Sequence, residues 1–192
     1  MTLRILTACL ATLTALPSFA APVTYNIDPS HTFPSFAADH LGGLSVWRGK
    51  FDSSSGKIVL DKEAGTGTVS ITVHTDSIDF GVPKLNEHTK SADMFDVVKF
   101  PTATYEGKFA KFKDGAPTEV DGTLTLHGVA KAVKLTINKF LCKPNPMSKK
   151  ETCGADASAS FNRADFGINY GQPYGFDMGV SLQIQVEAIK AD

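Results

Sequence analysis

The chain has 192 residues, which is enough for one domain with a substantial hydrophobic core. Its formal net charge at pH 7 is −1, so there is no basic excess of the kind that indicates nucleic acid or an anionic membrane surface as a partner. We therefore expect one domain and no nucleic-acid ligand.

The first twenty residues predict a cleaved secretory signal peptide. Arg4 precedes an uncharged stretch from Ile5 to Leu16, which Pro17 ends. Residues 18–20, Ser-Phe-Ala, fit the small-x-small pattern for cleavage after Ala20. Because the apolar stretch is too short to span a bilayer, we expect a mature domain of residues 21–192 without an integral membrane segment. Such a chain is exported to a compartment in which disulfides persist.

Two cysteines remain in the predicted mature chain, Cys142 and Cys153, because Cys9 would leave with the signal peptide. They flank a stretch rich in turn-forming residues, and a disulfide there would stabilise the fold by roughly 2–4 kcal/mol. A zinc pair is the rival interpretation. No second Cys-x-x-Cys and no His pair accompanies these cysteines, so the sequence favours the disulfide and predicts no metal site.

Short strands at close spacing follow the signal peptide. In the clearest of them Val69, Ile71 and Val73 alternate with polar residues, a period of two that indicates one dry and one wet face. Pro34 argues for an edge or a bulge within its strand. Residues 52–56, Asp-Ser-Ser-Ser-Gly, resemble a hairpin turn. The predicted strands are 23–27, 31–40, 44–51, 57–61, 68–78, 102–112, 119–126, 129–141, 155–161 and 180–188.

The stretch between residues 84 and 101 breaks this pattern. Residues 84–94 are mostly polar and helix-forming, enough for about three turns, and Pro83 suits a first helical turn. Met94, Phe95, Val97, Val98 and Phe100 then form a dense apolar run. We expect this helix to lie across the open end of a closed sheet, with the apolar run inserted as a cap.

The pattern predicts an all-β protein, either a sandwich or a barrel. Long strands with one dry face favour a closed barrel, because closure removes exposed edges. A barrel of eight antiparallel strands is also wide enough to hold one small ligand.

Recognisable catalytic machinery is scarce. The sequence has no Gly-x-Ser-x-Gly, no His-Glu-x-x-His and no phosphate-binding loop, so we predict no catalytic residues and no cofactor. His31 and His40 flank Pro34 and would point the same way if a bulge reverses the alternation. Two interpretations are open: the histidines make structural hydrogen bonds, or they bind the polar head group of a ligand. Arg163 is open to two interpretations as well, a salt bridge with Asp165 or a contact to a diphosphate or carboxylate.

The aromatic residues give the strongest indication of function. Thirteen phenylalanines and four tyrosines are many for a small β protein, and an apolar lumen suits a long lipid tail. We predict that the lining comprises Phe36, Trp47, Phe51, Phe95, Phe100, Tyr105, Phe161 and Phe166. Polar contacts near the rim are predicted from His31, His40 and Arg163.

Several motifs together resemble the YceI-like family across nearly all of the mature chain. They are Tyr25-Asn-Ile-Asp-Pro-Ser-His-Thr, Phe36, His40-Leu-Gly, Ser77-Ile-Asp79, Lys90-Ser-Ala-Asp93-Met-Phe-Asp, Lys99-Phe-Pro101, Gly122-Thr-Leu-Thr-Leu-His-Gly128-Val-Ala-Lys131 and Arg163-Ala-Asp-Phe-Gly167. The resemblance implies a lipocalin-like, eight-stranded antiparallel β-barrel with a helix near its mouth. It also implies an elongated amphiphile in the lumen, typically a polyisoprenoid or an isoprenoid quinone, and a bacterial periplasmic location.

Our main hypothesis is therefore a periplasmic lipid-binding barrel that transports or stores its ligand and is not an enzyme. One alternative is a filled barrel that binds a protein partner. Another is a lipid-modifying enzyme, which would need a nucleophile or carboxylate beside His31 or His40. The sequence leaves the oligomeric state open, a homodimer included.

Overall fold

The computed structural model describes residues 21–192, so the predicted signal peptide lies outside the described residues. Within 21–192, no helix combines the length and the apolar character that a membrane span requires. The strands are β1 (Val23–Ile27), β2 (Phe33–His40), β3 (Ser45–Phe51), β4 (Ser54–Asp61), β5 (Thr66–His74), β6 (Ile78–Asp79), β7 (Thr102–Lys113), β8 (Ala116–Leu126), β9 (Val129–Ala132), β10 (Leu135–Pro144), β11 (Glu151–Asn162) and β12 (Gly179–Lys190). The helices are α1 (Pro83–Lys90) and the 3₁₀ helices η1 (Thr75–Ser77), η2 (Arg163–Phe166) and η3 (Gln172–Tyr174).

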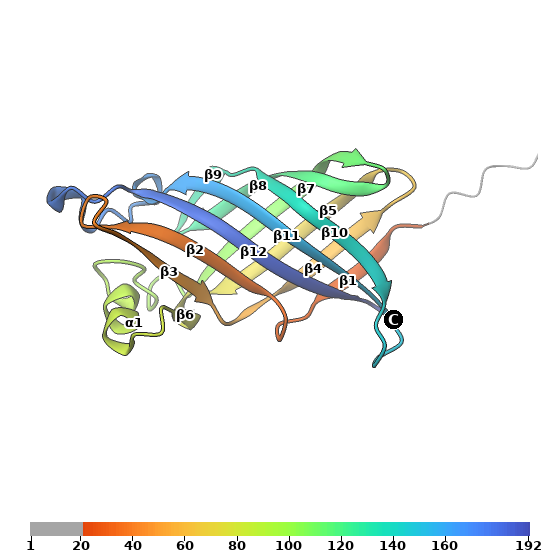
Figure 1. Ribbon diagram of the computed structural model, residues 1–192, viewed down its shortest axis with the longest axis horizontal. Helices are drawn as coiled ribbons and strands as arrows, with labels where there is room; N and C mark the ends of the chain where they lie inside the picture. Colours follow the sequence, from red (N-terminus) through yellow and green to blue (C-terminus); the bar gives the residue numbers. More distant parts are fainter. Residues whose placement is uncertain (1–20) are drawn as a thin grey trace, which may run out of the picture.

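These strands form a closed antiparallel barrel (Figure 1). Three pairs of strands each occupy one position in the barrel. β1 and β2 both pair with β12, and β9 and β10 both pair with β8. β3 and β4 form the next position, because β3 pairs with β2 and β4 pairs with β1. With each of these pairs taken as one interrupted strand, eight strands pair in chain order and β1 closes on β12. The predicted all-β, eight-stranded barrel is confirmed.

Alternation of side chains separates the inside of the barrel from the outside. Along β12, Val180, Leu182 and Ile184 face the lumen, whereas Ser181 and Gln183 are exposed. This period of two is what the sequence predicted for a sheet with one dry face. The buried apolar residues gather in two clusters, one that includes Tyr25 and Leu60 and one that includes Phe166 and Ile168.

A polar side chain bridges the interruption between β1 and β2. The buried Thr32 hydroxyl donates to the Glu187 carbonyl and accepts from the Glu187 N–H, each at 3.1 Å. The Glu187 carbonyl also accepts from the Asp28 N–H at 2.9 Å, so Thr32 supplies a second donor to that carbonyl and the acceptor for the Glu187 N–H. Pro34 pairs with β12 but precedes the first β2–β3 pair at Ser35, which agrees with the predicted edge position.

The predicted hairpin at residues 52–56 is wrong. Ser54, Ser55 and Gly56 belong to β4, which pairs with β1 and β5 and not with β3. Gly56 has φ +148°, and a Cβ there would lie 2.2 Å from the Ser70 carbonyl oxygen on β5. The glycine therefore lets two strands approach closely at a bend, and the chain continues forward instead of turning back.

Helix α1 lies at one end of the barrel beside β3 and β6, as predicted for a helix near the mouth (Figure 1). Pro83 occupies its first turn, but the helix ends at Lys90 and is shorter than predicted, because Ser91 is extended and donates its hydroxyl to the His88 carbonyl. Asn86 anchors the helix to β6: its amide donates to Asp79 at 2.7 Å and accepts from the Phe80 N–H at 2.8 Å.

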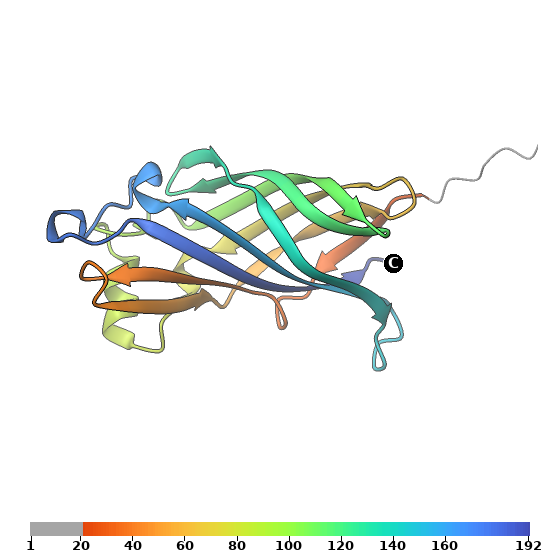
Figure 2. The same cartoon turned by 45° about the horizontal axis from the view of Figure 1, so that its top comes forward.

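The two ends of the barrel differ in construction. The end that carries α1 also carries the β2–β3 turn and the long segment between β11 and β12 (Figures 1 and 2). The opposite end carries the β10–β11 loop and the C-terminus (Figure 2). We call the first the mouth and the second the closed end.

Candidate ligand-binding cavity

A cavity of about 490 Å³ occupies the lumen. Its wall runs from Tyr25, Leu60 and Ala188, which are 1–2% exposed, to Trp47 and Phe176, which are partly exposed at the mouth. Most of the wall is aliphatic or aromatic. The volume falls in the range typical of small-molecule sites, and the wall allows apolar contacts along the whole length of a bound chain.

Aromatic rings from strands and loops line the mouth half of this wall. The Phe36 ring lies 5.7 Å from that of Phe51 and 5.3 Å from that of Phe80. Phe95, which follows α1, lies 5.8 Å from Phe51 between ring centroids. Met94 joins the same wall, so the chain after the helix closes part of the mouth side as expected.

The structure places most of the predicted lining in the wall, but not all of it. The predicted residues found there are Phe36, Trp47, Phe51, Phe95, Tyr105, Phe161, His40 and Arg163. Their contact with a ligand stays a prediction.

Phe100 and Phe166 lie outside the wall, contrary to prediction. Phe100 packs on His127 in the β8–β9 turn, with ring centroids 4.2 Å apart. Phe166, the last residue of η2, is 1% exposed and packs against Phe161 in the core, with ring centroids 5.2 Å apart. The predicted apolar cap is also incomplete, because Val98 is 93% exposed.

His31 is not near the rim either. It lies in the connection before β2, where its Nδ1 contacts the Asp28 carboxylate at 2.8 Å and the Ser30 hydroxyl at 3.0 Å. Its side chain is 61% exposed, and Asp28 raises its pKa. His40 ends β2 at the mouth, between the rings of Trp47 and Phe176. The whole length of β2 separates the two histidines, so they cannot hold one ligand head.

Helix α1 brings a polar side chain to the mouth of the cavity. Leu85, His88 and Thr89, one face of α1, line it from one side, and the His88 ring lies 4.6 Å from that of Tyr170. Thr89 is 1% exposed and donates its hydroxyl to the Leu85 carbonyl, which leaves His88 and His40 as the polar side chains best placed to meet a head group.

Arg163 is 8% exposed and makes no ion pair with Asp165. Its guanidinium donates to the carbonyls of Ile168 at 3.0 Å and Tyr170 at 2.8 Å. Burial lowers its pKa, and the charge of Asp39 opposes that shift. These two hydrogen bonds hold the segment between η2 and η3 in place. The contact between Arg163 and an anionic ligand group stays a prediction.

Tyr105 turns its polar atom away from the lumen. Its hydroxyl donates to the Val133 carbonyl at 2.8 Å, and burial raises its pKa to about 12. The ring thus offers the cavity an apolar face while the buried hydroxyl is satisfied.

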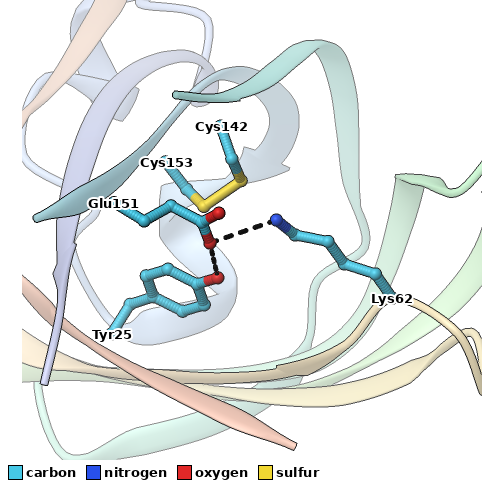
Figure 3. Close-up of a disulfide and its surroundings, with 5 residues drawn as sticks. All are labelled: Tyr25, Lys62, Cys142, Glu151 and Cys153. Atoms are coloured by element: carbon cyan, nitrogen blue, oxygen red, sulfur yellow. Dashed lines mark hydrogen bonds and ion pairs between the residues drawn. A yellow bond between two sulfur atoms is a disulfide. The ribbon is translucent and has the colours of Figure 1, made fainter. Parts of the chain in front are cut away.

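The closed end is sealed by a polar cluster and a disulfide (Figure 3). Tyr25 donates its hydroxyl to Glu151, which also accepts from Lys62 at 3.2 Å. The pKa of Tyr25 is raised, mainly by burial and also by its hydrogen bond to Glu151. The pKa of Glu151 is lowered, mainly by the hydrogen bond from Tyr25 and also by Lys62. Beside them Cys142 and Cys153 form a disulfide across directly opposed positions of β10 and β11.

The rival zinc interpretation finds one relevant grouping. The ligand atoms of Cys142, Cys153 and Glu151 lie within 4.8 Å of one another. Zinc binds thiolates, however, and here the two sulfurs are bonded to each other. The arrangement therefore fits a structural disulfide.

Sequence reasoning missed part of the wall. Phe80, Phe109, Phe140 and Phe176 line the cavity, and so do Tyr25, His88 and many aliphatic residues. The aliphatic ones could have been found from the strand alternation, because the dry faces recognised in the sequence are the faces that line the lumen. Phe80 and Phe176 lie outside regular strands, where no period predicts direction.

Together, the closed antiparallel strands, the mouth helix and the apolar lumen define a lipocalin-like β-barrel. The chain belongs to the family described by the YceI-like domain, whose model matches residues 25–188. A UPF0312 protein of Enterobacter sp. (strain 638) is 32% identical over 195 residues, covering 97% of each chain. Protein YceI of Salmonella arizonae is 31% identical and covers 94% of each chain.

Solved structures share the fold at lower identity. BcnA of Burkholderia cenocepacia matches with a TM-score of 0.67 and 20% identity, covering 84% of this chain and 99% of the other. A domain of Saccharophagus degradans described as polyisoprenoid-binding matches with a TM-score of 0.65 and 16% identity, covering 88% and 99%.

Proposed function

We propose that this chain is a periplasmic binding protein that holds a long-chain amphiphile, a polyisoprenoid or an isoprenoid quinone, in the barrel for transport or storage. The observation that carries the proposal is the largely apolar cavity of about 490 Å³, with His40 and His88 at its mouth. Each buried methylene of a bound chain would contribute about 0.8 kcal/mol, so the wall can bind a tail without fixed charges.

The related domain described as polyisoprenoid-binding supports the ligand class. The predicted signal peptide supports export, and export in turn supports a stable disulfide at the closed end. A filled barrel is the weaker alternative, because side chains from all around the barrel leave the lumen open.

An enzyme would need a nucleophile or a carboxylate beside His31 or His40, and the Asp28 carboxylate does lie beside His31. The cluster is, however, a local turn on the outer surface: Asp28 also accepts from the Ser30 N–H and hydroxyl. Both Asp28 and Ser30 contact the same ring nitrogen of His31, so that nitrogen cannot relay a proton between them in the manner of a catalytic triad. The cluster lies outside the cavity, which favours binding over catalysis.

The test is native mass spectrometry of the protein exported from the full chain, followed by solvent extraction of what travels with it. We expect one apolar chain with a polar head per protein. A protein that flies empty, and stays empty after incubation with quinones and prenyl phosphates, would contradict the proposal.

A matched pair of variants locates the site. Phe36→Asp places a carboxylate in the apolar wall and should abolish ligand retention. Ser181→Asp makes the same change on the exposed face of β12, beside the Leu182 that pairs with Phe36, and should retain the ligand. Equal retention by both folded variants would remove Phe36 from the site.

A further inference from the structure

Exposed apolar side chains surround the mouth of the barrel. Leu41 and Leu44 of the β2–β3 turn are 48% and 74% exposed, and Tyr170 and Tyr174 of the segment between β11 and β12 are 40% and 73% exposed. Val82, at the start of α1, is 41% exposed. We call these five residues the rim. Large exposed apolar groups that gather at one place on a protein mark a surface that binds something.

The rim is held together by polar contacts beneath it. The Asp39 carboxylate accepts from the backbone N–H groups of Gly42, Gly43 and Asp177, which joins the β2–β3 turn to the segment after η3. Those bonds lower the pKa of Asp39. Across the mouth, the contact between Tyr170 and His88 joins that segment to α1. The apolar side chains are therefore presented by fixed loops.

Two loops of the mouth lack charge. Residues 41–47 and 166–176, which contain four of the five rim residues, have no charged residue, although 20% of the whole chain is charged. The third part of the mouth, α1 and the chain after it, carries both signs of charge, with Lys84, Glu87, Lys90, Asp93, Asp96 and Lys99. The loops of the closed end read Asp-Lys-Glu at 61–63, Lys-Asp at 113–114 and Lys-Lys at 149–150. The first charged residues after the β2–β3 turn and after Val82 are the exposed cations Arg48 and Lys84.

We propose that the rim docks on the surface of a phospholipid bilayer. Leucine, valine and tyrosine can enter the interfacial layer with no ion to desolvate, and tyrosine favours that boundary because one end of it is apolar and the other wet. Arg48 and Lys84 would then meet the lipid phosphates. Docking at the rim opens the apolar cavity directly onto the layer, which extends the proposed function and is tested apart from it.

The experiment is flotation of the protein with vesicles of phosphatidylethanolamine and phosphatidylglycerol. The rim variant carries Leu44→Glu and Tyr174→Glu. The matched control carries Leu141→Glu and Met147→Glu, two residues of β10 and its following loop that are 56% and 91% exposed. We expect wild type and control to float, and the vesicle-bound fraction of the rim variant to fall at least about tenfold.

Three results would overturn docking: wild type that does not float, a rim variant that floats like wild type, or equal loss in both variants. Sedimentation that shows a dimer in wild type and a monomer in the rim variant, without flotation, would assign the rim to a second copy. Phe36→Asp should float like wild type. The two proposals fail separately: wild type that floats but carries no ligand contradicts the proposed function alone, and wild type that carries ligand but does not float contradicts docking alone.

Discussion

Removal of the Cys142–Cys153 disulfide gives a direct measure of how the closed end is stabilised. The cysteines are 11 positions apart. Closing a loop of that length lowers the conformational entropy of the unfolded chain and thereby stabilises the folded state by about 3 kcal/mol. For a domain of this size, each kcal/mol moves the melting temperature by about 2–4 °C, so the double variant Cys142→Ala with Cys153→Ala should melt roughly 6–12 °C lower. Cys153 is 8% exposed beside Tyr25 and Leu60, so loss of its packing adds to this figure.

The assay is thermal unfolding followed by Trp47 fluorescence, with and without a reductant. Reductant should lower the unfolding midpoint of wild type toward that of the double variant, and should leave the double variant unchanged. Thiol titration of the exported wild type should find no free thiol before reduction. A fully reduced wild type with its original midpoint would refute the stabilising role of the disulfide.

Two further predictions concern stability. Because Tyr25 lowers the pKa of Glu151, the stability that this contact supplies is present above the unfolded-state pKa of about 4.5 and is lost as pH falls through the folded-state pKa. Glu151→Gln should therefore reduce the unfolding free energy at pH 7 and flatten its decline below pH 4.5; parallel acid declines in the two proteins would contradict this. A Cβ at Gly122 would lie 2.4 Å from the Tyr105 hydroxyl oxygen, so Gly122→Ala should cost about 1–3 kcal/mol in urea unfolding. Gly154→Ala, whose nearest atom is 3.8 Å away, is the control, and equal losses would disprove the steric explanation.

The strands could be predicted from the sequence, whereas the points where they break could not. Alternation marks β5, β8 and β12 because each buries one face along its length. Residues 52–56 carry the Asp, Ser and Gly of a hairpin, but the same residues serve a bend in a strand that continues. Pairing across the barrel decides between the two outcomes, and no local pattern contains that information.

The candidate site was predictable to the extent that it follows the strand period. Phe36, Phe51 and Phe161 lie on strands with their direction set by alternation, and all three line the cavity. Phe100 and Phe166 are large apolar residues beside predicted strands, but both lie outside the strands, Phe166 in η2, where side-chain direction depends on contacts such as the one between Phe100 and His127. His31 was misplaced for a related reason, because the connection between β1 and β2 turns it outward against Asp28.

The two ends of the barrel also set the direction in which a ligand can enter. At the closed end Tyr25, Leu60 and Ala188 are almost fully buried, and the bond from Tyr25 to Glu151 lies beside a covalent link between neighbouring strands. Passage there would break a buried hydrogen bond and separate paired strands. At the mouth, several wall residues are partly exposed, among them Phe176 on a loop and Leu85 and His88 on the short helix α1, which Asn86 attaches to β6. Because displacing such side chains disrupts far less buried structure than opening the sheet, we expect a tail to enter through the mouth and to reach the Tyr25 end first, leaving its head between His40 and His88.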